Sequence, residues 1–210
     1  MKAVDSSDER KALMDRAAQL RGHMCLGIPL GVKMGLLGLR LLEMEDPAKR
    51  DKLVVFVEND KCPADGIQVT TGCSAGSGRL KMLDYGKSAA TFVDGRTGRG
   101  FRVYTRKDFP RQAFNLGVRD GLVKPGDEVV PFSKLDREIT MNAFMKMSID
   151  ELLGYDPVSV RWSKPLLPNR MAPKAYCARC GEEIMDGKGV SHGEQVLCGS
   201  CADGGYYSIL

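Results

Sequence analysis

Residues 177–201 read CARCGEEIMDGKGVSHGEQVLCGSC, and the cysteines in this stretch decide how the end of the chain folds. They form two Cys-x2-Cys pairs separated by seventeen residues: Cys177, Cys180, Cys198 and Cys201. Each pair directs two sulfurs to one point, and four thiolates at about 2.3 Å complete the coordination sphere of a structural Zn²⁺. The spacing therefore predicts a small zinc module over residues 177–210 with no open position for a substrate. We interpret His192 as a hairpin residue, because four cysteines already complete the sphere.

The composition of the whole chain is that of a globular protein. Its 210 residues are enough for one core of typical domain size and a small appendage, and 43% of them are hydrophobic and 28% charged. The longest apolar stretch, residues 24–42, is interrupted by Lys33 and Arg40, so we expect no membrane span. The first twenty residues contain acidic side chains where a secretory signal would be basic, and they lack an apolar segment, which predicts a cytoplasmic protein. In that compartment seven cysteines favour metal binding or thiol chemistry over a disulfide framework.

Charge does not demand a nucleic-acid partner. The formal net charge is only +4, and basic and acidic residues are interleaved along much of the chain. One stretch is locally basic, and we interpret it as a solvated strand face or a collar for an anion. It contains Arg96, Arg99, Arg102, Arg106, Lys107 and Arg111.

Helical patterns open the chain. A helix is predicted over residues 8–20, with Ser6 or Ser7 as its cap and Gly22 at its end. A second helix is predicted to start after Gly27, with apolar residues at helical spacing. It also carries a row of glycines, each of which costs about 1 kcal/mol in a helix interior, so we expect another element or a neighbouring protomer to pack closely there. The row is Gly31, Gly35 and Gly38.

The middle of the chain alternates β-branched runs with turns and helices. Strands are predicted at residues 53–57, 89–93, 100–105 and 158–162, and helices at 63–71, 109–122 and 136–153. The strands do not alternate regularly with crossover helices, so the predicted fold is α+β, with helices packed on a small mixed or antiparallel sheet. We expect the single tryptophan, Trp162, to pack in this core.

Prolines mark the boundary of the core domain. Pro165, Pro168 and Pro173 interrupt residues 164–176, which predicts a linker between a core domain at 1–163 and the zinc module.

Three further cysteines lie at predicted breaks between core elements. Cys25 lies two residues after His23 and between two helices, Cys62 lies at a helix start after a strand, and Cys73 lies in a glycine-rich turn. Together the four residues have the donor atoms for a soft or borderline divalent ion, whereas each alone could be a buried packing residue.

Two aspartates and a glycine-rich turn accompany these cysteines. Asp60 and Asp65 flank Cys62 and could bind a metal, orient a ligand or cap the helix, and capping by Asp60 is the role we expect. The turn at 72–78 lacks the lysine and hydroxyl residue that end a phosphate-binding loop, so we interpret it as the support of Cys73.

Several motifs in sequence order resemble the FmdE family, named after the E component of formylmethanofuran dehydrogenase. They are His23-Met-Cys25-Leu-Gly27, Cys62-Pro-Ala-Asp65-Gly-Ile-Gln68, Thr71-Gly-Cys73-Ser-Ala-Gly-Ser-Gly78 continuing through Asp84-Tyr-Gly86-Lys87, and Gly98-Arg-Gly-Phe-Arg-Val103. The resemblance covers roughly residues 10–150, and the cysteine tail resembles the treble-clef zinc finger that many members append. Leu26 and Gly66 depart from the family pattern of proline and alanine.

The resemblance implies an α+β core, a homodimer, and one cleft shared by the histidine and the cysteines. Carried over by position, the core site for a second divalent metal or a ligand is His23, Cys25, Cys62 and Cys73, with Asp60, Asp65 and Gln68 close by.

Three functions remain open at this point. The first is a metal-binding accessory protein that could dock on a redox enzyme. The second is a thiol enzyme in which Cys25 or Cys62 is the nucleophile and His23 the base. The third, which the mild charge disfavours, is a zinc-finger module that binds nucleic acid or protein.

Overall fold

A computed structural model describes residues 7–124, 126–131, 135–162, 166–167 and 173–205. Ser6 and linker residues 164, 165 and 168–172 lie outside these ranges. The chain divides into two compact units, residues 1–167 and 168–210.

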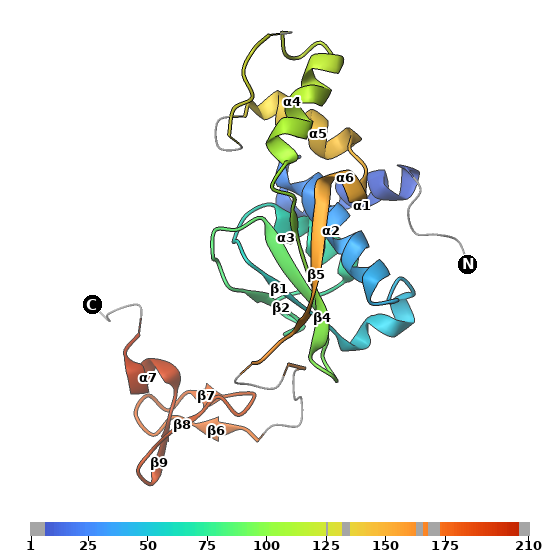
Figure 1. The fold of residues 1–210 in the computed structure, drawn as a ribbon. Helices are drawn as coiled ribbons and strands as arrows, with labels where there is room; N and C mark the ends of the chain where they lie inside the picture. The colour runs from blue at the N-terminus through green and yellow to red at the C-terminus, as the bar shows by residue number, and fades with distance from the viewer. Residues whose placement is uncertain (1–6, 125, 132–134, 163–165, 168–172, 206–210) are drawn as a thin grey trace. The chain divides into compact units, whose positions relative to one another are not determined.

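The larger unit is built on a five-stranded mixed sheet (Figure 1). The strand order is β2-β1-β3-β4-β5, in which β1 and β2 are parallel and the other neighbours are antiparallel. This arrangement confirms the predicted α+β fold. The strands are β1 (Leu53–Val57), β2 (Leu80–Met82), β3 (Ala89–Asp94), β4 (Arg99–Thr105) and β5 (Leu153–Ser159).

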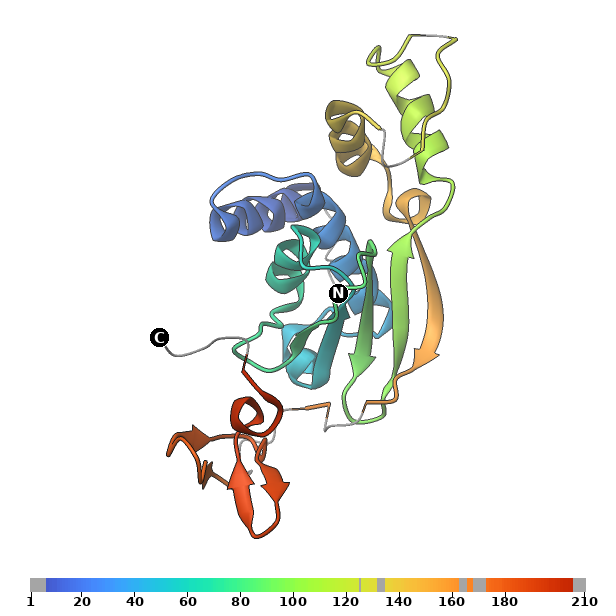
Figure 2. The same cartoon turned by 90° about the vertical axis from the view of Figure 1, so that its left-hand side faces the viewer.

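Helices cover one face of this sheet. Figure 2 shows the blue and teal helices on one side of the strands. The central helix is α2, which is buried from Ile28 to Leu39. It packs on the sheet face formed by alternate residues such as Val55, Phe92 and Val103, all fully buried. The helices are α1 (Ser7–Arg21), α2 (Gly27–Leu41), the 3-10 helix η1 (Pro47–Lys52), α3 (Pro63–Thr71), α4 (Phe109–Arg119), α5 (Arg137–Lys146) and α6 (Ile149–Leu152).

The glycine row of α2 marks contacts inside this chain. A Cβ at Gly35 would stand 2.7 Å from Cβ of Thr70 on α3, and one at Gly38 would stand 2.3 Å from the Phe92 ring on β3. Both distances are shorter than real Cβ contacts, so only glycine permits the helix to approach α3 and the sheet this closely. The close approach is therefore intramolecular at these positions.

The single helix predicted over 136–153 is wrong. Met147 is extended (φ −61°, ψ 142°) and ends α5, and Ser148 caps the short helix α6 through its hydroxyl, which accepts from the Glu151 N–H. The chain then turns directly into β5, so the last strand is Leu153–Ser159 rather than 158–162. Helical periodicity continued through this break because α6 buries Ile149 and Leu152 at a helical spacing.

The second face of the sheet has an apolar half and a polar half. Val54, Phe56 and Val93 are covered by residues after β5, including Trp162, whose ring meets Phe56 edge-on at 5.0 Å. Trp162 is 39% exposed, so it lies over the edge of this cluster and not in the core. Nearby, Arg102 makes two hydrogen bonds to Glu58, at 2.6 and 2.7 Å.

Part of the basic stretch is paired with carboxylates. Besides Arg102, Arg96 pairs with Asp94 at 2.7 Å and Arg106 with Asp108 at 3.3 Å. Of these three arginines only Arg102 lies within a strand, β4, whereas Arg96 precedes that strand and Arg106 follows it.

The described part of the smaller unit, residues 173–205, consists of two short hairpins and one helical turn. Its elements are β6 (Ala175–Tyr176), β7 (Glu183–Ile184), β8 (Val190–His192), β9 (Gln195–Leu197) and α7 (Gly199–Asp203). His192 ends β8 and pairs with Gln195 across the hairpin, as expected of a hairpin residue. Within the described residues of the chain, no helix has the length and apolar character needed to cross a membrane.

Candidate functional site

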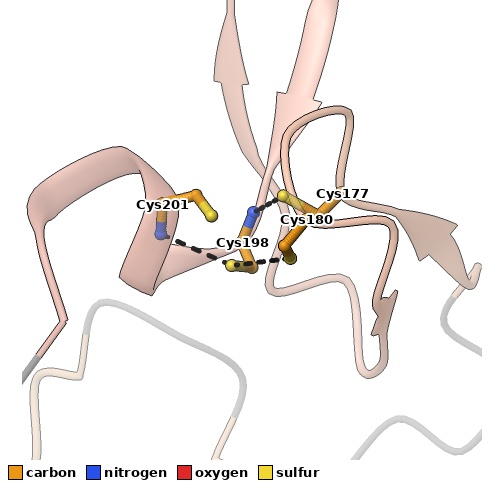
Figure 3. Close-up of side chains that lie close together, drawn as sticks. All are labelled: Cys177, Cys180, Cys198 and Cys201. Carbon is orange, nitrogen blue, oxygen red and sulfur yellow. Dashed lines mark hydrogen bonds between the residues drawn. The ribbon is translucent and has the colours of Figure 1, made fainter. Parts of the chain in front are cut away.

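The four tail cysteines converge on one point (Figure 3). Cys177 and Cys180 lie in the turn after β6, Cys198 is the N-cap of α7, and Cys201 lies in its first turn. Their sulfur atoms all lie within 4.8 Å of one another, and Sγ of Cys180 and Sγ of Cys198 are 4.0 Å apart. A tetrahedral metal with bonds of about 2.3 Å to sulfur needs sulfur separations of about 3.8 Å, so the donor set fits such an ion.

Backbone N–H groups prepare these sulfurs for metal binding. The Cys198 N–H donates to Sγ of Cys177 at 3.3 Å, and the Cys201 N–H donates to Sγ of Cys198 at 3.4 Å. Hydrogen bonds from the backbone of Cys180 and Cys198 lower the pKa of Cys177 to about 6. Interaction with the Cys198 sulfur and burial raise the pKa of Cys201 to about 12. A bound cation would relieve the repulsion between adjacent thiolates. The tail is therefore a metal-binding site that fits a treble-clef zinc finger.

In the larger unit, Cys25 and Cys62 meet and are joined by a disulfide, with their Cα atoms 6.4 Å apart. The bond links the loop before α2 to the start of α3. Both residues are half-buried and line a pocket of about 460 Å³. The sequence favoured metal binding or free thiols over a disulfide at these positions. The structure shows a bond because α2 and α3 begin side by side.

Close helix packing fixes the two cysteines. A Cβ at Gly27 would stand 2.9 Å from Cβ of Cys62, and one at Gly66 would stand 2.6 Å from the carbonyl oxygen of Ile28. Gly66, which departs from the family pattern of alanine, therefore permits the contact between α2 and α3.

The remaining pocket walls come from the carboxyl ends of two parallel strands and from α5. Residues 59–63 follow β1 and residues 84–88 follow β2. Because β1 and β2 are parallel, both segments lie at the same end of the sheet. Asn59 ties the two segments together: its Nδ2 donates to the Lys87 carbonyl at 2.7 Å, and its Oδ1 accepts from the Lys61 N–H at 3.2 Å. From α5, Thr140 and Phe144 complete the lining, and both are buried.

The four predicted core ligands do not form one cluster. In the described part of the chain, the tail cysteines are the only group of three or more histidine, cysteine or carboxylate ligands that close together. Cys73 follows the C-terminal end of α3, about 13 Å of helix away from Cys62, and its Sγ lies 3.4 Å from the Leu53 carbonyl. His23 is exposed and does not line the pocket.

The three predicted neighbours of the core site have separate positions. Asp60 lines the pocket but pairs with Lys61 at 2.5 Å, so the expectation that it caps α3 is wrong. The N-cap residue is Cys62, which makes no side-chain capping bond. Asp65 pairs with Arg21 of α1 at 2.8 Å, and Gln68 is half-buried on α3 outside the pocket lining.

Sequence reasoning missed most of the polar pocket residues. Asp84, Gly86 and Lys87 belong to a motif of the family resemblance that implies no role for them. These residues could have been found from the sequence only by recognising that they follow a strand parallel to β1. That strand, β2, has only three residues and therefore gives little sequence signal. The missed lining residues are Asn59, Lys61, Asp84, Lys87, Ser88, Thr140 and Phe144.

Comparisons with known proteins agree with this fold. The family model described as "FmdE, Molybdenum formylmethanofuran dehydrogenase operon" matches residues 20–153. A protein of Archaeoglobus fulgidus named "Probable S-adenosyl-L-methionine-binding protein" is 30% identical over 209 residues, which cover 94% of this chain and 54% of that protein. The chain therefore spans about half the length of that relative. A solved structure of a tungsten formylmethanofuran dehydrogenase FmdE-like protein from Syntrophus aciditrophicus has the same fold, with a TM-score of 0.61, 23% identity and 95% coverage of both chains.

Proposed function

The chain belongs to the FmdE family, and on that premise we propose that it is an accessory metal-binding protein with one structural and one exchangeable site. The structural site holds Zn²⁺ at the four tail cysteines. The exchangeable site is the core pocket, where reduced Cys25 and Cys62 bind a small ligand through a soft metal ion. The observation that carries the proposal is that these two cysteines meet and both line one pocket.

The donor atoms of the pocket support a soft or borderline ion. Two thiolates favour zinc, copper(I) or iron over magnesium or calcium, and the neighbouring Asp60 carboxylate is a further available donor. Leu26, Leu30 and Phe144 supply apolar surface on which an organic part of the ligand would pack. His23 would join only after a rearrangement of its loop, so we leave it outside the proposed coordination sphere.

A protein partner suits the tail better than a nucleic acid does. Residues 168–210 contain four basic and five acidic side chains, which is a poor match to a polyanion. Tyr176 and Met185 are exposed in this unit by 71% and 59%, so apolar surface is available for a protein contact. We propose that the protein acts in the cytoplasm as a homodimer that docks on a redox enzyme. Ultracentrifugation of the purified protein tests the dimer.

Metal content under defined redox conditions tests the two sites. The full chain, reduced and supplied with Co²⁺ or Zn²⁺, should hold two metal ions per chain, and oxidation of Cys25 and Cys62 should leave one. Cobalt reports sulfur ligation directly through its sulfur-to-metal absorption. The Cys25→Ser/Cys62→Ser variant should hold only the tail ion, and the Cys198→Ser/Cys201→Ser variant only the core ion.

A matched control separates ligation from general damage to the core. Cys73→Ala changes a cysteine that lies outside the pocket and should leave both ions in place. One ion in the reduced wild type, with no change in the Cys25→Ser/Cys62→Ser variant, would refute the core site and leave the tail site standing.

A further inference from the structure

The disulfide at the pocket suggests chemistry in addition to ligand binding. Cys25 and Cys62 are 37 residues apart in sequence, yet each is fixed by the contact between α2 and α3. Their Cα separation of 6.4 Å lies within the range that a disulfide spans without backbone movement. The same scaffold can therefore hold the bonded and the reduced pair.

Both cysteines lie at the positive end of a helix. Cys62 is the N-cap of the nine-residue α3, and the Cys25 carbonyl accepts from the Ile28 N–H in the first turn of the fifteen-residue α2. Cys62 makes no side-chain hydrogen bond to its helix, and the first turn of α2 contains no acidic residue. The first turn of α3 contains Asp65, whose charge is paired with Arg21 at 2.8 Å. Helix N-termini favour a negatively charged sulfur, which is the species that attacks a disulfide.

Access distinguishes this pair from the third core cysteine. Cys25 and Cys62 line the pocket and are half-buried, so a small thiol can reach a sulfur atom. Cys73 is fully buried, and burial raises the pKa of its thiol. The larger unit thus contains one accessible cysteine pair and one inert cysteine.

We propose that Cys25 and Cys62 form a reversible dithiol–disulfide couple that exchanges with small thiols entering the pocket. A thiolate of the small thiol attacks one sulfur, the Cys25–Cys62 bond breaks, and the other cysteine leaves as a thiolate and takes up a proton. A second small thiol then attacks the mixed disulfide. The protein gains two electrons and two protons, and two small thiols become one disulfide. This activity needs no metal and goes beyond the proposed ligand site.

Equilibration with glutathione tests the couple. The full chain, with zinc bound to the tail and the core free of metal, is incubated across ratios of reduced to oxidised glutathione, quenched with acid, alkylated and analysed by peptide mass spectrometry. The expected result is a reversible two-electron transition confined to the peptides of Cys25 and Cys62. Cys73 should remain a thiol throughout.

Single-cysteine variants trap the mixed-disulfide intermediate. In Cys62→Ser, oxidised glutathione should leave a mixed disulfide on Cys25, and in Cys25→Ser one on Cys62. Each should persist at least about 100-fold longer than in the wild type, because the second cysteine is positioned to resolve it. Circular dichroism verifies that the variants fold, and the wild-type titration stands without them.

Two results would overturn the inference: native wild type that keeps both thiols at every glutathione ratio, or a bond that forms and then resists reduction while the protein stays folded. The first result would leave metal binding by the reduced pair untouched, whereas the second would remove the reduced pair and with it the proposed ligand site. Conversely, a couple that cycles in protein that takes up no second ion when reduced and supplied with Zn²⁺ would support this inference and refute the proposed ligand site.

Discussion

Gly31 of α2 lies directly against Pro63 of α3, and a Cβ at residue 31 would stand 2.1 Å from the Pro63 carbonyl oxygen. No real Cβ atom approaches a carbonyl so closely, so the two helices cross with backbone against backbone. Pro63 immediately follows Cys62, and Gly31 lies six residues after Cys25. The contact that packs the helices therefore also sets the distance between the two pocket cysteines.

Gly31→Ala should destabilise the larger unit by about 1–3 kcal/mol, since the added methyl group must push the helices apart. Chemical denaturation measures this loss. Gly76→Ala is the matched control: no atom lies within 4 Å of its added Cβ, and its effect should stay within about 0.5 kcal/mol. The separation should also lower the fraction of molecules that form the Cys25–Cys62 bond at a fixed glutathione ratio. Equal stabilities for the two variants would contradict the close crossing.

Removal of metal should unfold the tail and spare the core. Among its described residues, 173–205, the smaller unit has a cluster of three buried residues, Cys177, Ile184 and Leu197, which is too little apolar area to fold a segment of this length alone. Metal binding must therefore supply most of its folding free energy. After chelation, hydrogen exchange should lose protection over 175–203 and keep it in β1 and β4. Retained protection in the tail would show that it folds without metal.

The Glu58–Arg102 pair on the second sheet face should have a larger coupling free energy than an exposed ion pair. The Glu58 side chain is only 8% exposed, and its hydrogen bonds raise the pKa of Arg102. A double-mutant cycle with Glu58→Gln and Arg102→Met should give a coupling free energy of about 1–2 kcal/mol, allowing for the partial exposure of the arginine. The same cycle on Asp94 and Arg96, whose arginine is 62% exposed, should give less than about 0.5 kcal/mol. Equal couplings would show that burial does not strengthen the pair.

Residue pattern and spacing along the chain correctly predicted those elements whose local residue preferences match their surroundings in the fold. The β-branched run at 53–57 is a buried strand, and the tail cysteines meet as their spacing requires. The glycine row correctly predicted close packing, although sequence alone could not decide between a helix of the same chain and a neighbouring protomer.

Long-range contacts account for what the sequence could not predict. Lys33 interrupts an apolar stretch, yet it is buried because its Nζ donates to the carbonyls of Met145 and Met147 at the end of α5. Its partners are more than a hundred residues away. Likewise, the proximity of Cys25 to Cys62 and the distance of Cys73 from both depend on the orientation of α3, which periodicity does not reveal. Residue type alone therefore grouped four core ligands that the fold separates.

The segment between α5 and β5 should be less stable in acid, because its capping box depends on an ionised glutamate. The Ser148 hydroxyl accepts from the Glu151 N–H, and Glu151 accepts from both the N–H and the hydroxyl of Ser148. These hydrogen bonds, that from the Ser148 backbone most of all, hold the pKa of Glu151 below its usual range. Because the folded pKa is lowered, the contribution is present above the unfolded pKa of about 4.3 and is lost as pH falls through the folded value.

Two variants isolate this contribution. Ser148→Ala should lower the free energy of unfolding by about 1 kcal/mol at pH 7. Glu151→Gln keeps the side-chain shape and removes the ionised form, so its difference from the wild type should be largest at pH 7 and shrink toward zero near pH 3. Urea denaturation at the two pH values measures both differences. If the Glu151→Gln difference were the same at pH 3 and pH 7, ionisation of Glu151 would not contribute to stability, and the capping box would act only through neutral hydrogen bonds.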